Sequence, residues 1–142
     1  MAKSASSTII LRGTGIQKEA VANAAITPGH LVRLRSDGNI EVMGTAAATG
    51  GVQKAFAKEN EVVGKGIDDA YAASDNCIYS VMYPGSEVYA LIADGVTTTV
   101  AGALESAADG TLKPVTTGDP VAIALEAVTA SGAAARVRVA VL

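Results

Sequence analysis

The chain has 142 residues, a length typical of one domain that can bury a true hydrophobic core. Its formal net charge of −3 argues against a nucleic-acid-binding protein, which usually carries a concentrated basic face. Tryptophan is absent and Phe56 is the only phenylalanine, although 49% of the residues are hydrophobic. Small and β-branched residues dominate instead, and they favour layered β structure over a bundle of long helices.

The N-terminal segment is more basic than the rest of the chain. Lys3, Arg12 and Lys18 all precede the first acidic residue. The first eight residues are small and polar, which is typical of segments that are disordered when free. We therefore predict a flexible basic arm over residues 1–18 and a single β domain over residues 19–142.

The sequence also bears on the compartment in which the protein is made. Cys77 is the only cysteine, so no intrachain disulfide can form. The residues after Met1 are polar, unlike the apolar run of a secretory signal. No apolar run approaches the roughly 20 residues that span a bilayer. We expect a soluble protein that is made in the cytoplasm and does not bind a membrane.

A β-hairpin is predicted shortly after the turn at Pro28-Gly29. Two apolar runs, at residues 31–34 and 40–42, are separated by Asp37-Gly38. An Asp-Gly pair between apolar runs is a strong hairpin signal, because both central residues of a type I′ turn need positive φ. The same turn chemistry recurs at Asp109-Gly110, which predicts a second hairpin.

Further strands are predicted on both sides of the Pro84-Gly85 turn and at the end of the chain. Residues 77–83 and 88–92 have the mostly apolar pattern of strands buried on both faces. Arginines alternate with valines over residues 136–141, which is typical of a half-exposed strand. Short strands separated by turns predict a mainly β fold, a small sandwich or barrel with at most one or two short helices.

Residues that commonly carry catalysis or bind metals are scarce. His30 is the only histidine, so it is the only imidazole that could serve Cys77 as a base. The acidic stretch at residues 68–76 lacks the ligand order of a calcium loop, and Gly64-Lys65-Gly66 lacks the spacing of a phosphate-binding loop. We therefore expect no catalytic residue, no cofactor and no metal, and thus not an enzyme.

A ligand-binding β domain, for example for sugars, stays open as an alternative. Such sites often use aromatic platforms. Three of the four tyrosines fall in predicted strands, where packing in a core or an interface is favoured. The four are Tyr71, Tyr79, Tyr83 and Tyr89.

The order of several turn-rich segments resembles that of a known family. The chain is similar to tailed-bacteriophage capsid cement, or head decoration, proteins in the segments FAKENEVVGKGIDDAYAASDNCIYSVMYPGSEVYALIADG and GALESAADGTLKPV. The upstream segments ITPGHLVRL and DGNI fit the same pattern, so the resemblance covers roughly residues 26–140. Family members usually carry a glycine where Ser74 stands.

The resemblance implies a non-enzymatic structural protein on the outer face of an icosahedral phage head. It implies a small β domain, β-tulip-like, with an extended N-terminal arm. It further implies that the partner is the major capsid protein and favours a homotrimer, with no direct nucleic acid contact. Another virion role, as a head–tail or tail component, remains the main alternative.

We expect the N-terminal arm to contact the capsid. Its apolar part is suited to adding a strand to a capsid edge, and its basic side chains are suited to acidic capsid residues. The candidate capsid-contact residues are Lys3, Thr8, Ile9, Ile10, Leu11, Arg12 and Lys18.

Overall fold

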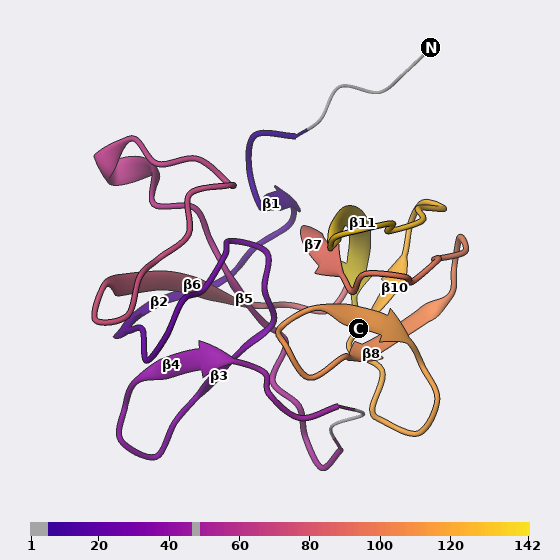
Figure 1. Cartoon of the computed structure of the whole chain (residues 1–142), viewed down its shortest axis with the longest axis horizontal. Coiled ribbons are helices and arrows are strands. Elements are labelled where there is room, and N and C mark those ends of the chain that lie inside the picture. The colour runs from indigo at the N-terminus through magenta and orange to yellow at the C-terminus, as the bar shows by residue number, and fades with distance from the viewer. Residues whose placement is uncertain (1–5, 47–48) are drawn as a thin grey trace.

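The computed structural model describes residues 6–46 and 49–142 (Figure 1). Nearly all regular structure in this part of the chain is β strand. The one helical element there is a short 3-10 turn, η1 (Glu61–Val63), which ends at Gly64 in the left-handed conformation. The predicted mainly β class, with no more than one or two short helices, is confirmed.

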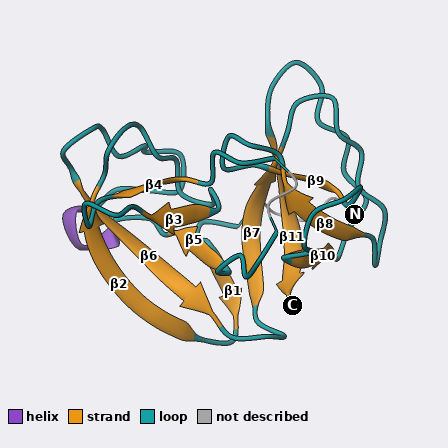
Figure 2. Cartoon of the chain, turned by 90° about the horizontal axis from the view of Figure 1, so that it is seen from below, coloured by secondary structure: helices purple, strands orange, loops and turns teal. Residues whose placement is uncertain are grey.

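A five-stranded barrel forms one half of the molecule (Figures 1 and 2). Its strands are β7 (Glu87–Ile92), β8 (Ala103–Ser106), β9 (Leu112–Pro114), β10 (Ala122–Ala124) and β11 (Ala135–Val141). The order around the barrel is β7, β11, β10, β8 and β9, and a parallel pairing of Ile92 with Leu112 joins β9 back to β7. The other pairings within this ring are antiparallel, so the barrel is mixed.

The barrel interior is filled by alternating aliphatic side chains. In β11, Val137, Val139 and Val141 are buried, while the residues between them are half-buried. This alternation is what the sequence predicts for a half-exposed strand. Strands β8 and β9 form the second predicted hairpin, whose turn contains Gly110 at φ +83°.

A smaller β layer forms the other half. Its sheet has the order β2 (Gly15–Val21), β6 (Asn76–Met82) and β5 (Ala55–Ala57), and the hairpin of β3 (Val32–Leu34) and β4 (Ile40–Val42) pairs separately. The predicted hairpin is present, but its turn is not the predicted type I′, because Gly38 has positive φ (+87°) and Asp37 does not. A second hydrophobic cluster, which includes Ile26, Ile40 and Tyr79, packs this half.

Pro84 and Gly85 connect the two halves. The strands predicted on both sides of this turn are present, but β6 belongs to the three-stranded sheet and β7 to the barrel. Strand β1 (Ile10–Arg12) pairs with the beginning of β7, at Glu87 and Val88. The barrel edge of β7 is therefore shared between β1 at its start and β9 at its end.

Arg136 of β11 also ties the halves together. Its guanidinium lies over the Tyr89 ring, 5.8 Å from the centroid. Nη1 donates to the Pro28 carbonyl at 2.9 Å, and Nη2 donates to the Ile67 carbonyl at 2.6 Å. One barrel side chain thus holds the loop before β3 and the loop before β6.

We expected a flexible arm over residues 1–18, but from residue 9 onward this segment is part of the folded domain. Residues 10–12 pair with β7, and residues 15–18 belong to β2, which pairs with β6. The expected boundary at residue 18 falls inside β2. Residues 1–5 lie outside the described part of the chain.

Candidate interaction surface

The predicted capsid-contact residues have very different environments. Ile9 is fully buried, so it belongs to the core and is not available to a partner. Ile10 and Leu11 are half-buried in and beside the β1–β7 pairing. Thr8 is exposed, and its Oγ1 donates to the Ile10 carbonyl at 3.2 Å. Lys3 lies outside the described residues.

The two described basic candidates are exposed. Arg12 forms an ion pair with Glu87 at 3.5 Å, with an arginine side chain that is 80% exposed. Lys18 lies in the middle of β2 and forms no ion pair within residues 6–46 and 49–142. Of the seven candidates, the structure therefore leaves Thr8, Arg12 and Lys18 accessible.

Backbone bonds fix the segment that contains Ile9. The Ile9 N–H donates to Oε2 of the buried Glu59 at 3.1 Å, and the Tyr89 N–H donates to the Ile9 carbonyl at 2.7 Å. A strand already bonded in this way is not free to join a capsid sheet. The apolar run at residues 9–11 signals burial inside this fold.

Sequence reasoning missed the edge strand that follows. In antiparallel pairs, residues alternate between those that bond to the partner strand and those whose N–H and C=O point away. The Tyr83 N–H donates to the Thr14 carbonyl at 3.2 Å, and the Ala22 N–H donates to the Asp75 carbonyl at 2.8 Å. Even-numbered residues of β2 therefore bond to β6, and the odd-numbered residues direct their backbone groups outward.

β2 forms the outer edge of its sheet, as Figure 2 shows at the left of the molecule. Five of its seven residues are exposed. Ile16 is 50% exposed, and on the same face lies Tyr83, which is 49% exposed. An exposed edge with apolar neighbours is the geometry that strand addition uses. A sequence signal existed, because Gln17, Lys18 and Glu19 interrupt the apolar pattern expected of a covered strand.

The η1 turn stands beside this edge. Val62 and Val63 are 84% and 64% exposed. Lys58 Nζ donates to Gln17 Oε1 at 3.3 Å and to Glu61 Oε1 at 3.1 Å, so it connects β2 with the start of the turn. The exposed valines thus belong to a turn that Lys58 connects to β2.

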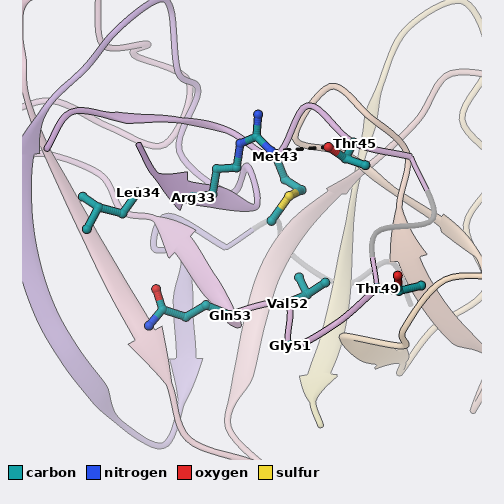
Figure 3. A pocket seen from close by; sticks show the side chains of 8 residues that line it. All are labelled: Arg33, Leu34, Met43, Thr45, Thr49, Gly51, Val52 and Gln53. Atoms are coloured by element: carbon teal, nitrogen blue, oxygen red, sulfur yellow. Dashed lines mark hydrogen bonds between the residues drawn. The ribbon is translucent and has the colours of Figure 1, made fainter. Parts of the chain in front are cut away.

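An open cleft of about 470 Å³ lies between the β3–β4 hairpin and the segment before β5 (Figure 3). Arg33 is the only titratable side chain among its described lining residues. Its Nε donates to Glu41 Oε1 at 2.8 Å, and its Nη1 donates to Thr45 Oγ1 at 3.3 Å. The lining residues are Arg33, Leu34, Met43, Thr45, Thr49, Gly51, Val52 and Gln53.

The candidate reactive groups lie outside this cleft, Cys77 buried and His30 half-buried. Burial raises the pKa of the Cys77 thiol to about 12, so the thiol stays protonated at neutral pH. Burial also lowers the pKa of His30, opposed by the Asp109 charge and assisted by Arg136. The His30 Nδ1 accepts a bond from the Thr27 N–H at 3.1 Å. In the described residues, no three His, Cys, Asp or Glu side chains gather where they could hold a metal ion.

Helices that could cross a membrane are absent from the part of the chain that the structure describes.

Comparisons with known proteins show a structural likeness. No protein-family model matches the chain, and no curated protein matches it. The crystal structure of the head fiber gp8.5 N base of bacteriophage phi29 is similar, with a TM-score of 0.56 and 16% sequence identity. The likeness covers 89% of this chain and 93% of that one. At this identity the likeness shows a shared fold.

Proposed function

We propose that this chain is a structural component of a phage virion that binds the outer surface of the icosahedral head. The observation that carries the proposal is the fold shared with the head fiber gp8.5 N base of bacteriophage phi29 over 89% of the chain. The sequence resemblance to capsid cement proteins is an independent argument for the same location. The proposed partner is the major capsid protein, and a homotrimer is the favoured state.

The proposed mechanism is mechanical. A shell under pressure from packed DNA fails where neighbouring subunits part. A protein bound across two subunits must lose contacts before they separate, so its binding free energy adds to the barrier against rupture. Contacts with several subunits raise the avidity well above that of one contact.

A different virion role is the second candidate. The structural neighbour is the base of a head fiber, so this chain is also suited to being the base of an appendage, or a head–tail or tail component. Such a base needs one firm attachment and does not need to bridge subunits. The position of the chain on the virion distinguishes the two roles.

A glycan-binding domain has less support. Tyr71 and Tyr79 are buried in the second cluster, and Tyr89 lies beneath Arg136. Tyr83 is the one tyrosine whose ring is about half exposed. A single exposed ring makes a poor platform for a sugar.

The test is co-sedimentation of the purified protein with phage heads. We expect the protein to pellet with expanded, undecorated heads and to saturate at a fixed number of copies per head. Unexpanded shells and an unrelated β protein of similar charge are the controls. The proposal would be overturned if the protein stayed in the supernatant when mixed with expanded heads of the phage that encodes it.

A further inference from the structure

Among the described strands, β2 is the long edge that the fold leaves uncovered. The barrel closes on itself, and the outer side of β5 is met by a bridge from Leu31 to Phe56. Beyond β2, a bridge joins Ala22 to Ile40. The stretch before that bridge has outward-pointing backbone groups at Gly15, Gln17 and Glu19.

We propose that the outer edge of β2 binds an extended segment of a different polypeptide as an added antiparallel strand, and that Lys18 and Glu19 select its register. The edge has neither of two common obstacles to such pairing, a proline or a bulge, and its charged residues Lys18 and Glu19 restrict the pairing to partners of complementary charge. It is seven residues long, contains no proline and pairs with β6 in continuous register. The backbone groups of the added strand would supply affinity, and the side chains would supply selectivity.

The charges of β2 define the partner. Lys18 and Glu19 are neighbours, so their side chains point to opposite faces of the sheet. Opposite charges across a strand pair stabilise it, and like charges destabilise it. An antiparallel partner therefore needs a basic residue opposite Glu19, followed at once by an acidic residue opposite Lys18. Glu19 Oε2 accepts a bond from Asn76 Nδ2 at 2.8 Å, which positions the carboxylate and leaves Oε1 for the partner.

An apolar residue completes the pattern. Ile16 lies two residues from Lys18 on the same face, beside the half-exposed Tyr83. The partner residue opposite Ile16 would bury the apolar surface of both side chains. In the direction of the partner chain, the predicted motif is basic, acidic, any residue, apolar.

A second copy of this chain fits the edge less well than a partner with the complementary order of charges. If two copies of β2 paired antiparallel around a two-fold axis, the outward-pointing residues of one copy would have to pair with those of the other. The axis would therefore pass through one residue of each strand and not between two residues. The register with full overlap of Gly15–Val21 is centred on Lys18 and places two ammonium groups opposite each other. Centring on Glu19 opposes two carboxylates. Centring on Gln17 places Lys18 opposite Ile16 and Glu19 opposite Gly15, so neither charge gains an opposite charge. The register that would pair Lys18 with Glu19 of the other copy is forbidden by this alternation.

The first experiment uses the peptide Thr-Val-Lys-Glu-Thr-Ile-Thr as the probe, with amide hydrogen exchange of the isolated protein as the readout. In the free protein, we expect slow exchange at Ile16, Lys18 and Ala20 and fast exchange at Gln17 and Glu19. The peptide should protect Gln17 and Glu19 and leave the other three unchanged. No protection at about 1 mM peptide, the weak end of specific binding, would overturn the proposal.

A matched pair of variants tests the backbone bond itself. Gln17→Pro removes one outward N–H and leaves the bonds to β6, whereas Gln17→Ala keeps that N–H and removes the same side chain. We expect Gln17→Pro to weaken peptide binding at least tenfold and Gln17→Ala to change it less than threefold. Equal binding by the two folded variants would contradict strand addition. If Gln17→Pro does not fold, the charge variant below decides the question.

The charge variant tests the register. In the double variant Lys18→Glu, Glu19→Lys, the preference should invert, so that the peptide with Lys and Glu exchanged binds about tenfold better than the original. An unchanged preference would exclude Lys18 and Glu19 as the selecting residues. These experiments use the isolated protein, so their failure is separate from failure to bind heads. If heads bind Gln17→Pro as well as the natural chain, the head contact lies elsewhere.

Discussion

Ser74 occupies a backbone conformation that favours glycine. Its φ is +73°, and its N–H donates to the Ala22 carbonyl at 2.8 Å. A residue with a side chain pays roughly 1–2 kcal/mol for this left-handed region. Glycine adopts this region at no steric cost, so the serine at this position corresponds to a local strain.

Replacement of Ser74 should therefore stabilise the protein. We expect Ser74→Gly to raise the free energy of unfolding by about 0.5–1 kcal/mol, because the relief of strain exceeds the added chain entropy of glycine. Ala73→Gly is the matched control, since Ala73 has no positive φ, and it should destabilise by about 0.5 kcal/mol. Urea unfolding measures both. A less stable Ser74→Gly would show that the turn is unstrained.

Glu105 is a carboxylate with no exposed surface, and it lies on the opposite face of β8 from the core residue Leu104. Thr116 Oγ1 donates to its Oε1 at 2.8 Å, the Gly118 N–H donates to its Oε2, and Lys113 Nζ lies 3.5 Å from Oε1. Burial acts to raise the pKa of Glu105, but the bonds from Thr116 and Gly118 and the Lys113 charge together lower it. The charged form is thus the one that the fold stabilises.

The pH dependence follows from that direction. The pKa of Glu105 is lower in the folded state than in the unfolded state. Its contribution to the free energy of unfolding is therefore complete above the unfolded pKa, about 4.3, and is lost as the pH falls through the folded pKa. We expect Glu105→Gln to cost about 2 kcal/mol at pH 7 and less at pH 3. Thermal unfolding across this pH range measures the difference. Glu61→Gln, on the exposed η1 turn, is the control and should change stability at pH 7 by less than about 0.5 kcal/mol.

At the scale of elements, the residues of the turns predicted the two hairpins. The sequence did not show which strands pair when they are distant along the chain. Asp37-Gly38 and Asp109-Gly110 each join two neighbouring strands, because the glycine supplies the positive φ at which the chain reverses. Pro84-Gly85 has similar local chemistry, yet its two strands enter different sheets. Which sheet a strand joins is decided by contacts distant in sequence, such as those of β7 with β11.

Arg136 is one of these distant contacts, and its geometry suits a planar guanidinium. We expect Arg136→Lys to destabilise the protein by about 1–2 kcal/mol, because a lysine cannot bond the Pro28 and Ile67 carbonyls together while stacking on Tyr89. Arg138→Lys, two residues along β11, is the control and should change stability by less than about 0.5 kcal/mol. Equal effects in chemical denaturation would contradict the linking role of Arg136.

For the whole molecule, the sequence predicted the fold class better than it predicted the surface. Apolar residues at 9–11 were interpreted as a free strand, but a run of this kind is equally suited to burial, and Ile9 is in fact buried. Lys18 was assigned to a contact surface for its charge, and the polar run from Gln17 to Glu19 was not interpreted as the sheet edge that it is. Exposure of an edge depends on what the remaining strands cover, so composition alone does not reveal it.

The most direct measurement is electron microscopy of expanded heads mixed with the purified protein. The proposed bridging role predicts density that fits this fold on the outer surface, at a fixed lattice position and in contact with at least two major capsid protein subunits. Density at a tail or portal, or attached within a single subunit, would contradict bridging.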